Sequence, residues 1–292
     1  MNADFDPDSF PTGLAEQLEP LVMRVLAGNP SPYTFTGTQT YVVGHKSDRA
    51  VIDPGPAIDE HIDAILAAVG DAKITAIMCT HTHRDHSPAA IPLAARTGAP
   101  IIGCAPLVIN DDGPRADESF DKTYNPDRVL TDGEILSGDG WTIEAVATPG
   151  HTSNHLCFAV QESGAMFTGD HVMAWSTSVI VPPDGDMADY MASLQKIYER
   201  KDKVYYPAHG KKVDKPQQLV RGMMGHRKQR ERQILKLLES GASAIPEMVT
   251  KMYKGLDPRL TGAAGQSVKA HLIDLQNRKL VSVDDDIWKI SA

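Results

Sequence analysis

The sequence predicts an α/β sandwich followed by a small winged-helix domain, and two observations carry this prediction. Short apolar runs alternate with helical patterns through the first two hundred residues, whereas the patterns from about residue 216 onward are mostly helical. The charge changes at nearly the same place, from 16 Lys and Arg against 30 Asp and Glu in residues 1–220 to 13 against 8 in residues 221–292. An acidic body and a basic tail indicate two modules, which we place at 1–215 and 216–292.

The strands expected in the first module are short runs rich in β-branched and aromatic residues, bounded by Gly, Pro or Asp. They lie at 40–44, 49–55, 74–80, 100–104, 141–148, 155–160, 165–170 and 203–210. Apolar residues recur at helical spacing over 57–70, 87–97 and 186–200. Ser87 and Pro88 suit the cap and first turn of the second of these helices. The polar stretch 105–128 predicts an exposed loop beside the site.

The second module shows three helical patterns followed by an alternating segment. The helices are expected at 217–241, 244–255 and 263–280. Residues 280–292 alternate apolar and polar side chains around three consecutive aspartates, which is typical of a hairpin. Three helices and a two-stranded wing together predict a winged helix-turn-helix.

The composition excludes several classes of protein. No stretch approaches the roughly 18 consecutive apolar residues that span a membrane, and the acidic N-terminus has no leader pattern, so we expect no membrane association and a cytoplasmic location. The three cysteines (Cys79, Cys104 and Cys157) are widely spaced in apolar stretches and form no C-x-x-C pair. We interpret them as small buried side chains rather than metal ligands. Nothing in the sequence determines the oligomeric state.

Four potential metal ligands follow the apolar strand 74–80 within six residues: His81, His83, Asp85 and His86. Imidazole and carboxylate groups are good ligands for divalent metals, and catalytic sites leave one coordination position open. Asp85 and His86 are adjacent in sequence and point away from the pair formed by His81 and His83. One metal would leave some of these side chains unused, so the cluster predicts two.

Further ligands are expected from other loops at the same edge of the scaffold. His151 follows a strand and a Pro-Gly turn, Asp170 ends the strand at 165–170, and His209 ends the strand at 203–210. Each of these residues stands beside glycine or proline in a short loop that terminates a strand. Active sites on α/β scaffolds are commonly assembled from such loops.

The motifs HTHRDH (81–86), PGHT (149–152), TGD (168–170) and YPAHG (206–210), preceded by VIDPG (51–55), resemble those of the metallo-β-lactamase superfamily in their order. The resemblance covers roughly residues 35 to 215 and implies an αββα sandwich. It assigns one metal to His81, His83 and His151, and the other to Asp85, His86 and His209, with Asp170 bridging both. It implies two Zn²⁺ ions as cofactors, with Mn²⁺ or Fe²⁺ as alternatives.

The resemblance also implies a dinuclear hydrolase in which a metal-bridging hydroxide attacks a carbonyl carbon or a phosphorus. Asp85 would orient the nucleophile in addition to binding metal. His171 either donates a proton to the leaving group or acts as a hydrogen-bonding support, and both interpretations stay open. Asp53 and His155 are expected to support the ligands.

The C-terminal segment resembles that of the metallo-β-lactamase-like protein 2 group, whose members include endoribonucleases acting on single-stranded RNA and thioesterase-like enzymes, and the endoribonuclease is the main interpretation. The alternative is a thioesterase like glyoxalase II that acts on a small acyl substrate, followed by a lactonase, a β-lactamase or a persulfide dioxygenase. The RNA interpretation predicts phosphate contacts from Arg227, Lys228 and Arg230. A solvated helix face with ion pairs is the simpler explanation of this run of charge. The expected partner is thus a small molecule or RNA.

Overall fold

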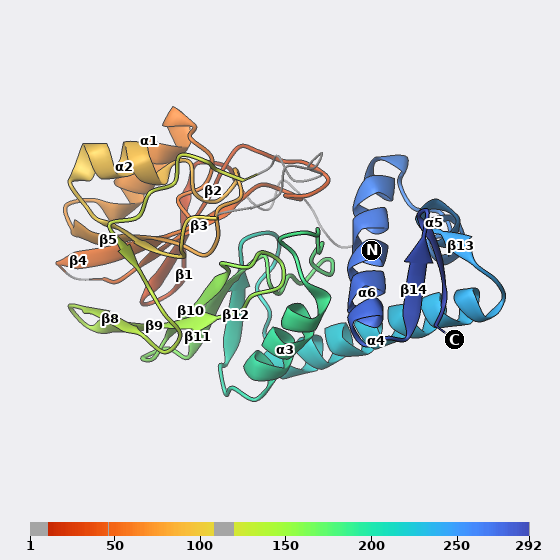
Figure 1. The fold of residues 1–292 in the computed structure, drawn as a ribbon. Coiled ribbons are helices and arrows are strands. Elements are labelled where there is room, and N and C mark those ends of the chain that lie inside the picture. Colours follow the sequence, from red (N-terminus) through yellow and green to blue (C-terminus); the bar gives the residue numbers. More distant parts are fainter. Residues whose placement is uncertain (1–10, 46, 108–119, 292) are drawn as a thin grey trace.

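The computed structural model describes residues 11–45, 47–107 and 120–291, which form two facing β-sheets, outer helices and a C-terminal helical domain (Figure 1). The first sheet has seven strands in the order β1-β2-β3-β4-β5-β6-β7. Their bounds are Ala15–Glu19, Val22–Leu26, Gln39–Val43, Asp48–Ile52, Lys73–Cys79, Ile101–Gly103 and Arg128–Val129. Pairing is antiparallel from β1 to β4 and parallel from β4 to β7.

The second sheet has five strands in the order β12-β11-β10-β9-β8. Their bounds, in that order, are Val204–Pro207, Ala165–Gly169, Leu156–Val160, Trp141–Ala147 and Ile135–Gly138. Helices α1 (Asp59–Val69) and α2 (Ala90–Thr97) lie on the first sheet, and α3 (Met187–Tyr198) lies on the second (Figure 1). The predicted αββα sandwich is therefore confirmed.

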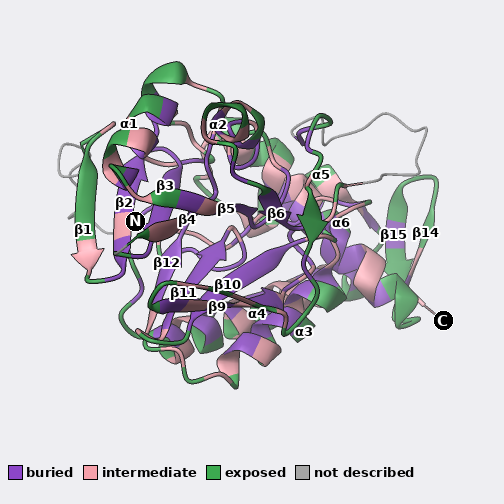
Figure 2. Cartoon of the chain, turned by 90° about the vertical axis from the view of Figure 1, so that its left-hand side faces the viewer, coloured by how far each residue is buried: buried purple, intermediate pink, exposed green. Residues whose placement is uncertain are grey.

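The core lies between the two sheets, where the strands are buried on their inner faces (Figure 2). Tyr41 of β3 meets Phe167 of β11 with ring centroids 4.8 Å apart. A second apolar cluster fills the space between the second sheet and α3, where Tyr190 and Leu194 are fully buried. Strands β3, β10 and β11 are buried along their whole length because they lie inside their sheets and not at the edges.

The C-terminal segment is a winged helix, as predicted (Figure 1). It comprises α4 (Pro216–Glu239), β13 (Ser243–Ala244), α5 (Ile245–Met252), a 3₁₀ turn (Pro258–Leu260), α6 (Thr261–Asn277), β14 (Val281–Asp284) and β15 (Ile287–Ile290). The sheet has the order β13-β15-β14 and thus one strand more than the predicted hairpin. Helix α4 also packs against α3, which joins this segment to the sandwich.

Three predictions from the sequence differ from the structure. Strands β1, β2, β7 and β8 were not expected. Helix α2 begins at Ala90 without a side-chain cap, because the hydroxyl of Ser87 donates instead to Asp121 at 2.9 Å. The predicted loop 105–128 is not fully exposed, since Phe120, Asp121 and Tyr124 are buried, while residues 108–119 lie outside the described part.

Two simpler expectations agree with the structure. All three cysteines are free and buried. Among the described helices, none is both long enough and apolar enough to cross a membrane.

Candidate metal centre

The predicted ligands converge from loops that follow four strands of the two sheets. The loop after β5 carries His81, His83, Asp85 and His86, and the loop after β9 carries His151. Asp170 comes directly after β11, and His209 follows the neighbouring strand β12. Because β11 and β12 are parallel and hydrogen-bonded, their carboxyl ends place these last two residues side by side.

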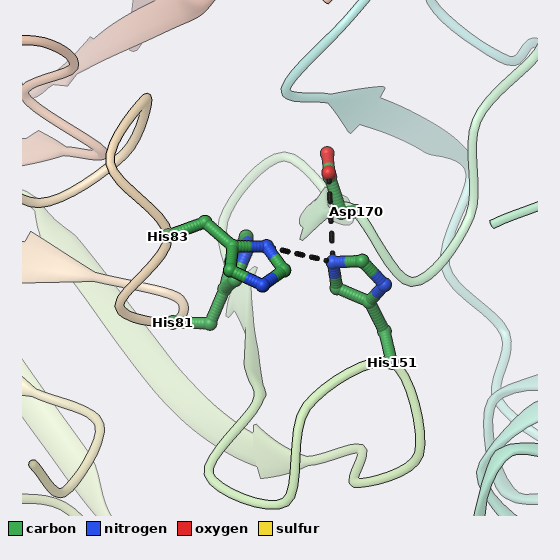
Figure 3. Close-up of side chains that lie close together, drawn as sticks. All are labelled: His81, His83, His151 and Asp170. Atoms are coloured by element: carbon green, nitrogen blue, oxygen red, sulfur yellow. Dashed lines mark hydrogen bonds and ion pairs between the residues drawn. The ribbon is translucent and has the colours of Figure 1, made fainter. Parts of the chain in front are cut away.

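The first group of potential ligands consists of His81, His83, His151 and Asp170 (Figure 3). His83 Nδ1 lies 2.9 Å from His81 Nε2 and 3.1 Å from His151 Nε2. One oxygen of Asp170, Oδ2, lies 3.6 Å from His151 Nε2. One ligand atom from each residue lies within 4.8 Å of the others, which is the spacing that ligands of a single ion adopt.

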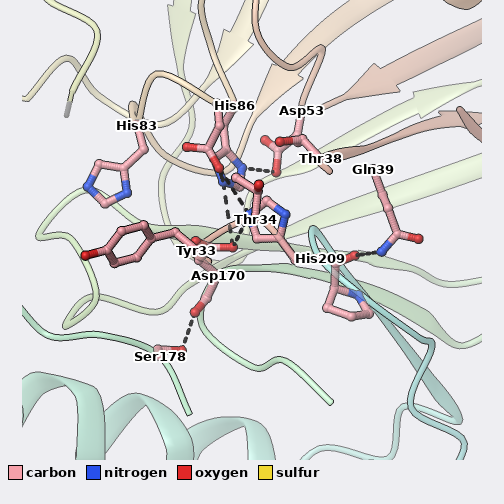
Figure 4. Close-up of polar contacts among 12 residues, drawn as sticks. Tyr33, Thr34, Thr38, Gln39, Asp53, His83, His86, Asp170, Ser178 and His209 are labelled. Carbon is pink, nitrogen blue, oxygen red and sulfur yellow. Dashed lines mark hydrogen bonds and ion pairs between the residues drawn. The ribbon is translucent and has the colours of Figure 1, made fainter. Parts of the chain in front are cut away.

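The second group consists of Asp85, His86 and His209, and Figure 4 shows part of it with its supporting residues. Asp85 Oδ2 lies 3.1 Å from His209 Nε2 and 3.3 Å from His86 Nε2. The other oxygen of Asp170, Oδ1, lies 3.3 Å from His209 Nε2 and 3.7 Å from His86 Nε2. The two oxygens of Asp170 therefore face different groups, which suits a carboxylate that bridges two cations.

Backbone carbonyls and a carboxylate fix the orientation of three ligand rings from behind. His151 Nδ1 donates to the carbonyl of Val179 at 2.7 Å, and His209 Nδ1 donates to that of Gly37 at 3.1 Å. His86 Nδ1 donates to Asp53 at 3.0 Å. Since each Nδ1 donates its hydrogen to this partner, Nε2 is the ring nitrogen that faces the centre and could bind a cation.

Asp53 supports the centre in the way the sequence predicts. It accepts hydrogen bonds from the backbone N–H and the hydroxyl of Thr80, at 2.7 and 2.8 Å, as well as from His86. The hydroxyl of Thr80 also lies 3.0 Å from His81 Nδ1. One buried carboxylate thus contacts a ligand of the second group directly and a ligand of the first group through Thr80.

The protonation states follow from burial and from the neighbouring charges. Burial lowers the pKa of His81 well below its usual value and that of His151 to about 4. Burial opposes ionisation of Asp170, yet the nearby His209 and His86 hold the pKa of Asp170 below its usual range. Burial likewise opposes protonation of His86, but Asp85 and Asp170 raise its pKa. Cation binding would therefore displace protons from the second group.

The residues present fit a pair of divalent cations. His86 Nε2, His209 Nε2 and Asp170 Oδ1 are buried and make no hydrogen bond of good geometry, although buried polar atoms are normally paired. All three atoms face the same point. The donor set of imidazole nitrogens and carboxylate oxygens is the one that borderline divalent metals prefer.

Gly169 lets the two sheets approach each other beneath the centre. Its φ is +49°, and a Cβ built there would lie 2.7 Å from both His155 Nε2 and the hydroxyl of Thr80. Real Cβ atoms are not found at such distances, so only glycine fits at this position. It holds Asp170, from the second sheet, close to the loop that follows β5 in the first.

The structure places His155 and His171 behind the ligands. His155 Nδ1 lies 2.9 Å from the Thr148 hydroxyl, and its ring is 5.1 Å from that of His81, which is a supporting position. His171 is fully buried, with its ring 5.0 Å from Tyr190, and neither ring nitrogen has a hydrogen bond of good geometry. Burial lowers the pKa of His171 to about 3, so its ring is uncharged at neutral pH and is a weak acid. These contacts favour the supporting role for His171 over the catalytic one.

The predicted phosphate contacts are wrong for Arg227. Its side chain is 3% exposed, donates to the carbonyl of Ser178 and lies over the Tyr190 ring at 5.1 Å. Arg230 is half-buried over Tyr253 at 4.2 Å and donates to the carbonyl of Met252. Helix periodicity turns both side chains inward. The exposed cations of α4 include Arg221, Lys228 and Arg232, so only Lys228 of the predicted three faces solvent.

Ser178 and Val179 are functional residues that sequence reasoning missed. The hydroxyl of Ser178 donates to the carbonyl of Asp170 and lies 3.0 Å from that of His171, while Val179 holds His151. Arg227 in turn holds the carbonyl of Ser178, so a helix of the C-terminal segment braces two ligands (Figure 4 shows Ser178 beside Asp170). Neither residue carries a sequence signal, because they act through backbone carbonyls and a hydroxyl.

Comparisons with known proteins agree with the two-domain fold described above. Residues 33–209 match the metallo-beta-lactamase superfamily, and residues 244–288 match the beta-lactamase associated winged helix domain. An atrochrysone carboxyl ACP thioesterase from Cryptosporiopsis sp. is 33% identical over 82% of this chain and 70% of its own length. A second atrochrysone carboxyl ACP thioesterase, from Aspergillus fumigatus, is 35% identical over 76% of this chain and 66% of its own length.

Solved structures show the same fold at low sequence identity. A beta-lactamase domain protein from Burkholderia ambifaria superposes with a TM-score of 0.78 at 15% identity, over 99% of this chain and 96% of the other. A metallo-beta-lactamase family protein from Thermus thermophilus gives 0.71 at 19% identity, over 94% and 99% of the two chains. With its ligand motifs, both domains and these relatives, the chain belongs to the metallo-β-lactamase superfamily of hydrolases.

Proposed function

We propose that the chain is a metal-dependent thioesterase that hydrolyses an acyl thioester borne by an acyl carrier protein. The observation that carries the proposal is the pair of ligand groups sharing Asp170, found in a chain with relatives named as thioesterases. A thioester acyl group, rather than RNA, is thus the preferred substrate class.

The reaction uses the centre as follows. Two divalent cations, Zn²⁺ with Mn²⁺ or Fe²⁺ as alternatives, would be held by the two ligand groups, where they would lower the pKa of water and polarise a carbonyl oxygen. Asp85, with 26% of its side chain exposed, can accept a proton from the attacking water and orient it. The thioester carbonyl would lie beside Asp85, the one residue of the second group that is not buried.

The leaving group favours a thioester over a phosphodiester. A thiol has an unperturbed pKa of about 8.5, so it can depart as a thiolate without a strong acid beside it. A sugar hydroxyl is a much weaker acid and needs a proton as it departs. His171, the proton donor considered from the sequence, is fully buried and faces Tyr190, so it is not placed to supply that proton.

The RNA interpretation keeps one supporting observation, the exposed stripe of Arg221, Lys228 and Arg232 on α4. Cations spaced seven and four residues apart share one helix face, and such a face can contact phosphates. The stripe is equally a solvated helix face. Of the three predicted residues, Arg227 and Arg230 instead donate to the carbonyls of Ser178 and Met252.

The test is a parallel incubation of the purified chain, supplied with Zn²⁺, with an acyl–carrier-protein thioester and with single-stranded RNA. We expect release of free thiol from the thioester, loss of that release in His81→Ala, and no RNA cleavage that depends on His81. RNA cleavage lost in His81→Ala, without thioester turnover, would overturn the proposal in favour of the endoribonuclease.

A further inference from the structure

An open groove with a volume of about 570 Å³ runs between the segment 173–177 and helix α4. The α4 wall is formed by Gln218, Leu219, Gly222, Met223 and His226. These residues lie at the i, i+1, i+4, i+5 and i+8 positions of one helix face. With a rise of 1.5 Å per residue, the wall from residue 215 to residue 226 is about 16 Å long. The groove thus suits a linear ligand rather than a compact one.

The wall of the groove formed by residues 173–177 lies next to residues that adjoin the metal centre. The segment 173–177 begins three residues after the bridging Asp170. Trp175 of that segment stacks on Phe35, with ring centroids 4.8 Å apart and planes at 9°. The same indole lies against Gly210, where a Cβ would be 3.0 Å from Trp175 Cδ1, and Gly210 follows the ligand His209. A ligand in the groove therefore contacts a segment that begins three residues after Asp170 and packs on Gly210, the residue that follows His209.

Positive charge at the α4 N-terminal end of the groove favours binding of an anion there. Its described lining includes Lys212 and Lys215 and no Asp or Glu, in a chain with a net charge of −9. Lys212 also contacts Asp214 at 2.8 Å, outside the lining. Helix α4 begins beside these lysines with no acidic residue in its first turn and no side-chain cap. Two lysines together with a helix N-terminus favour a phosphate.

The remaining lining matches a chain of amide and methylene groups. Met173, Trp175, Leu219 and Met223 supply apolar surface, and Ser176, Thr177 and Gln218 supply hydrogen-bonding groups. A few polar groups within an apolar lining are typical of small-molecule sites. A ligand that fits this groove would therefore carry a phosphate, a linear chain with two amide groups and, near the centre, a reactive acyl group.

We infer that this groove binds the 4′-phosphopantetheine arm of the acyl carrier protein and leads its thioester to the metal centre. The inference rests on the proposed function, because that function supplies a thioester on such an arm. The phosphate lies against Lys215 and Lys212 at the start of α4, and the pantetheine amides lie along the helix. The winged-helix segment thus contributes to substrate binding through α4.

Two glycines of α4 provide a matched test. Gly222 lines the groove and Gly225 does not, and a Cβ at either position would meet no atom within 4 Å. Phenylalanine at either position improves helix propensity, so both variants should fold. We expect Gly222→Phe to weaken binding of free 4′-phosphopantetheine at least tenfold by calorimetry and to raise KM for the acyl–carrier protein. Gly225→Phe should change neither, and equal effects of the two variants would overturn the inference.

A charge reversal tests the phosphate end. We expect Lys215→Glu to weaken binding of 4′-phosphopantetheine at least tenfold while binding of dephosphorylated pantetheine changes less than twofold. Lys236→Glu, on the exposed last turn of α4 outside the groove, is the control. Equal losses for both ligands would overturn the assignment of the phosphate. If 4′-phosphopantetheine binds as expected but no thioester is hydrolysed, the groove is supported as a binding site and the proposed function is rejected. If thioesters are hydrolysed but the groove binds no 4′-phosphopantetheine, the proposed function is supported and the groove assignment is rejected.

Discussion

Arg227 provides the most informative perturbation, because a residue of α4 holds the backbone beside two metal ligands. Arg227→Met keeps the apolar stem and removes the guanidinium group. The variant leaves the buried carbonyl of Ser178 without its donor, at a cost of about 1–3 kcal/mol. It also loses the contact with Tyr190, which contributes about 1–2 kcal/mol in a desolvated place. We therefore expect the free energy of unfolding to fall by about 2–5 kcal/mol.

The same substitution should reach the metal centre. Residues 178 and 179 hold the carbonyl of Asp170 and the Nδ1 of His151, and loss of such outer contacts typically lowers metal affinity about 10–100-fold. Denaturant unfolding measures the first effect, and competition with a chromophoric chelator for Zn²⁺ measures the second. Lys228→Met, on the exposed neighbour, should change stability by less than about 0.5 kcal/mol. Wild-type affinity in Arg227→Met would refute the idea that α4 braces the centre.

Three further changes should have distinct outcomes. Asp53→Asn keeps a residue type that tolerates the φ of +48° but weakens the hold on His86, so Zn²⁺ affinity should fall about 10–100-fold while the far-ultraviolet circular dichroism stays unchanged. His271 is buried without a hydrogen bond, and burial lowers its pKa to about 3. As the pH falls, the unfolded chain therefore binds a proton at this residue at a higher pH than the folded chain does. The free energy of unfolding thus decreases as the pH falls from about 6.5 towards 3. In urea unfolding, His271→Leu should remove about 2–3 kcal/mol of the wild-type loss between pH 7 and pH 4.5, and identical losses would contradict this. Gly169→Ala should lower the free energy of unfolding by about 2–4 kcal/mol through overpacking and a positive φ, whereas Gly98→Ala, also at positive φ but in open space, should cost only about 1–2 kcal/mol.

The candidate site could be predicted well from the sequence because each ligand ends a recognisable strand. Apolar runs identify the strands β5, β11 and β12. The carboxyl ends of neighbouring parallel strands lie at the same edge of a sheet, so residues that follow them are brought close together. The spacing of His81 and His83 then requires an irregular backbone. Which ring nitrogen faces the centre could not be predicted, because the carbonyls that fix it come from residues distant in sequence, such as Gly37 for His209.

The environment of the basic helix was the harder part to predict. The residues 227 to 232 are a run of charge in the sequence, but a helix turns by 100° per residue, so neighbours face opposite environments. Only the packing of α4 on α3 decides that Arg227 points inward and Lys228 outward. Strands β1 and β8 were missed for a related reason: they lie at sheet edges, where their exposed residues give no continuous apolar signal.

The single hydrogen atom that serves as the side chain of Gly169 has a consequence for how this centre responds to strain. His81 follows a strand of one sheet and Asp170 follows a strand of the other, so their separation depends on the spacing between the two sheets, which backbone hydrogen bonds such as that from Leu156 N–H to the carbonyl of Thr80 (2.8 Å) also hold. The close approach of Gly169 to Thr80 limits that spacing beneath the centre. Substitutions in the apolar layer between the sheets will therefore change catalysis as well as stability, even when they lie far from any ligand. In this protein, the packing of the core between the sheets determines the distances between the metal ligands.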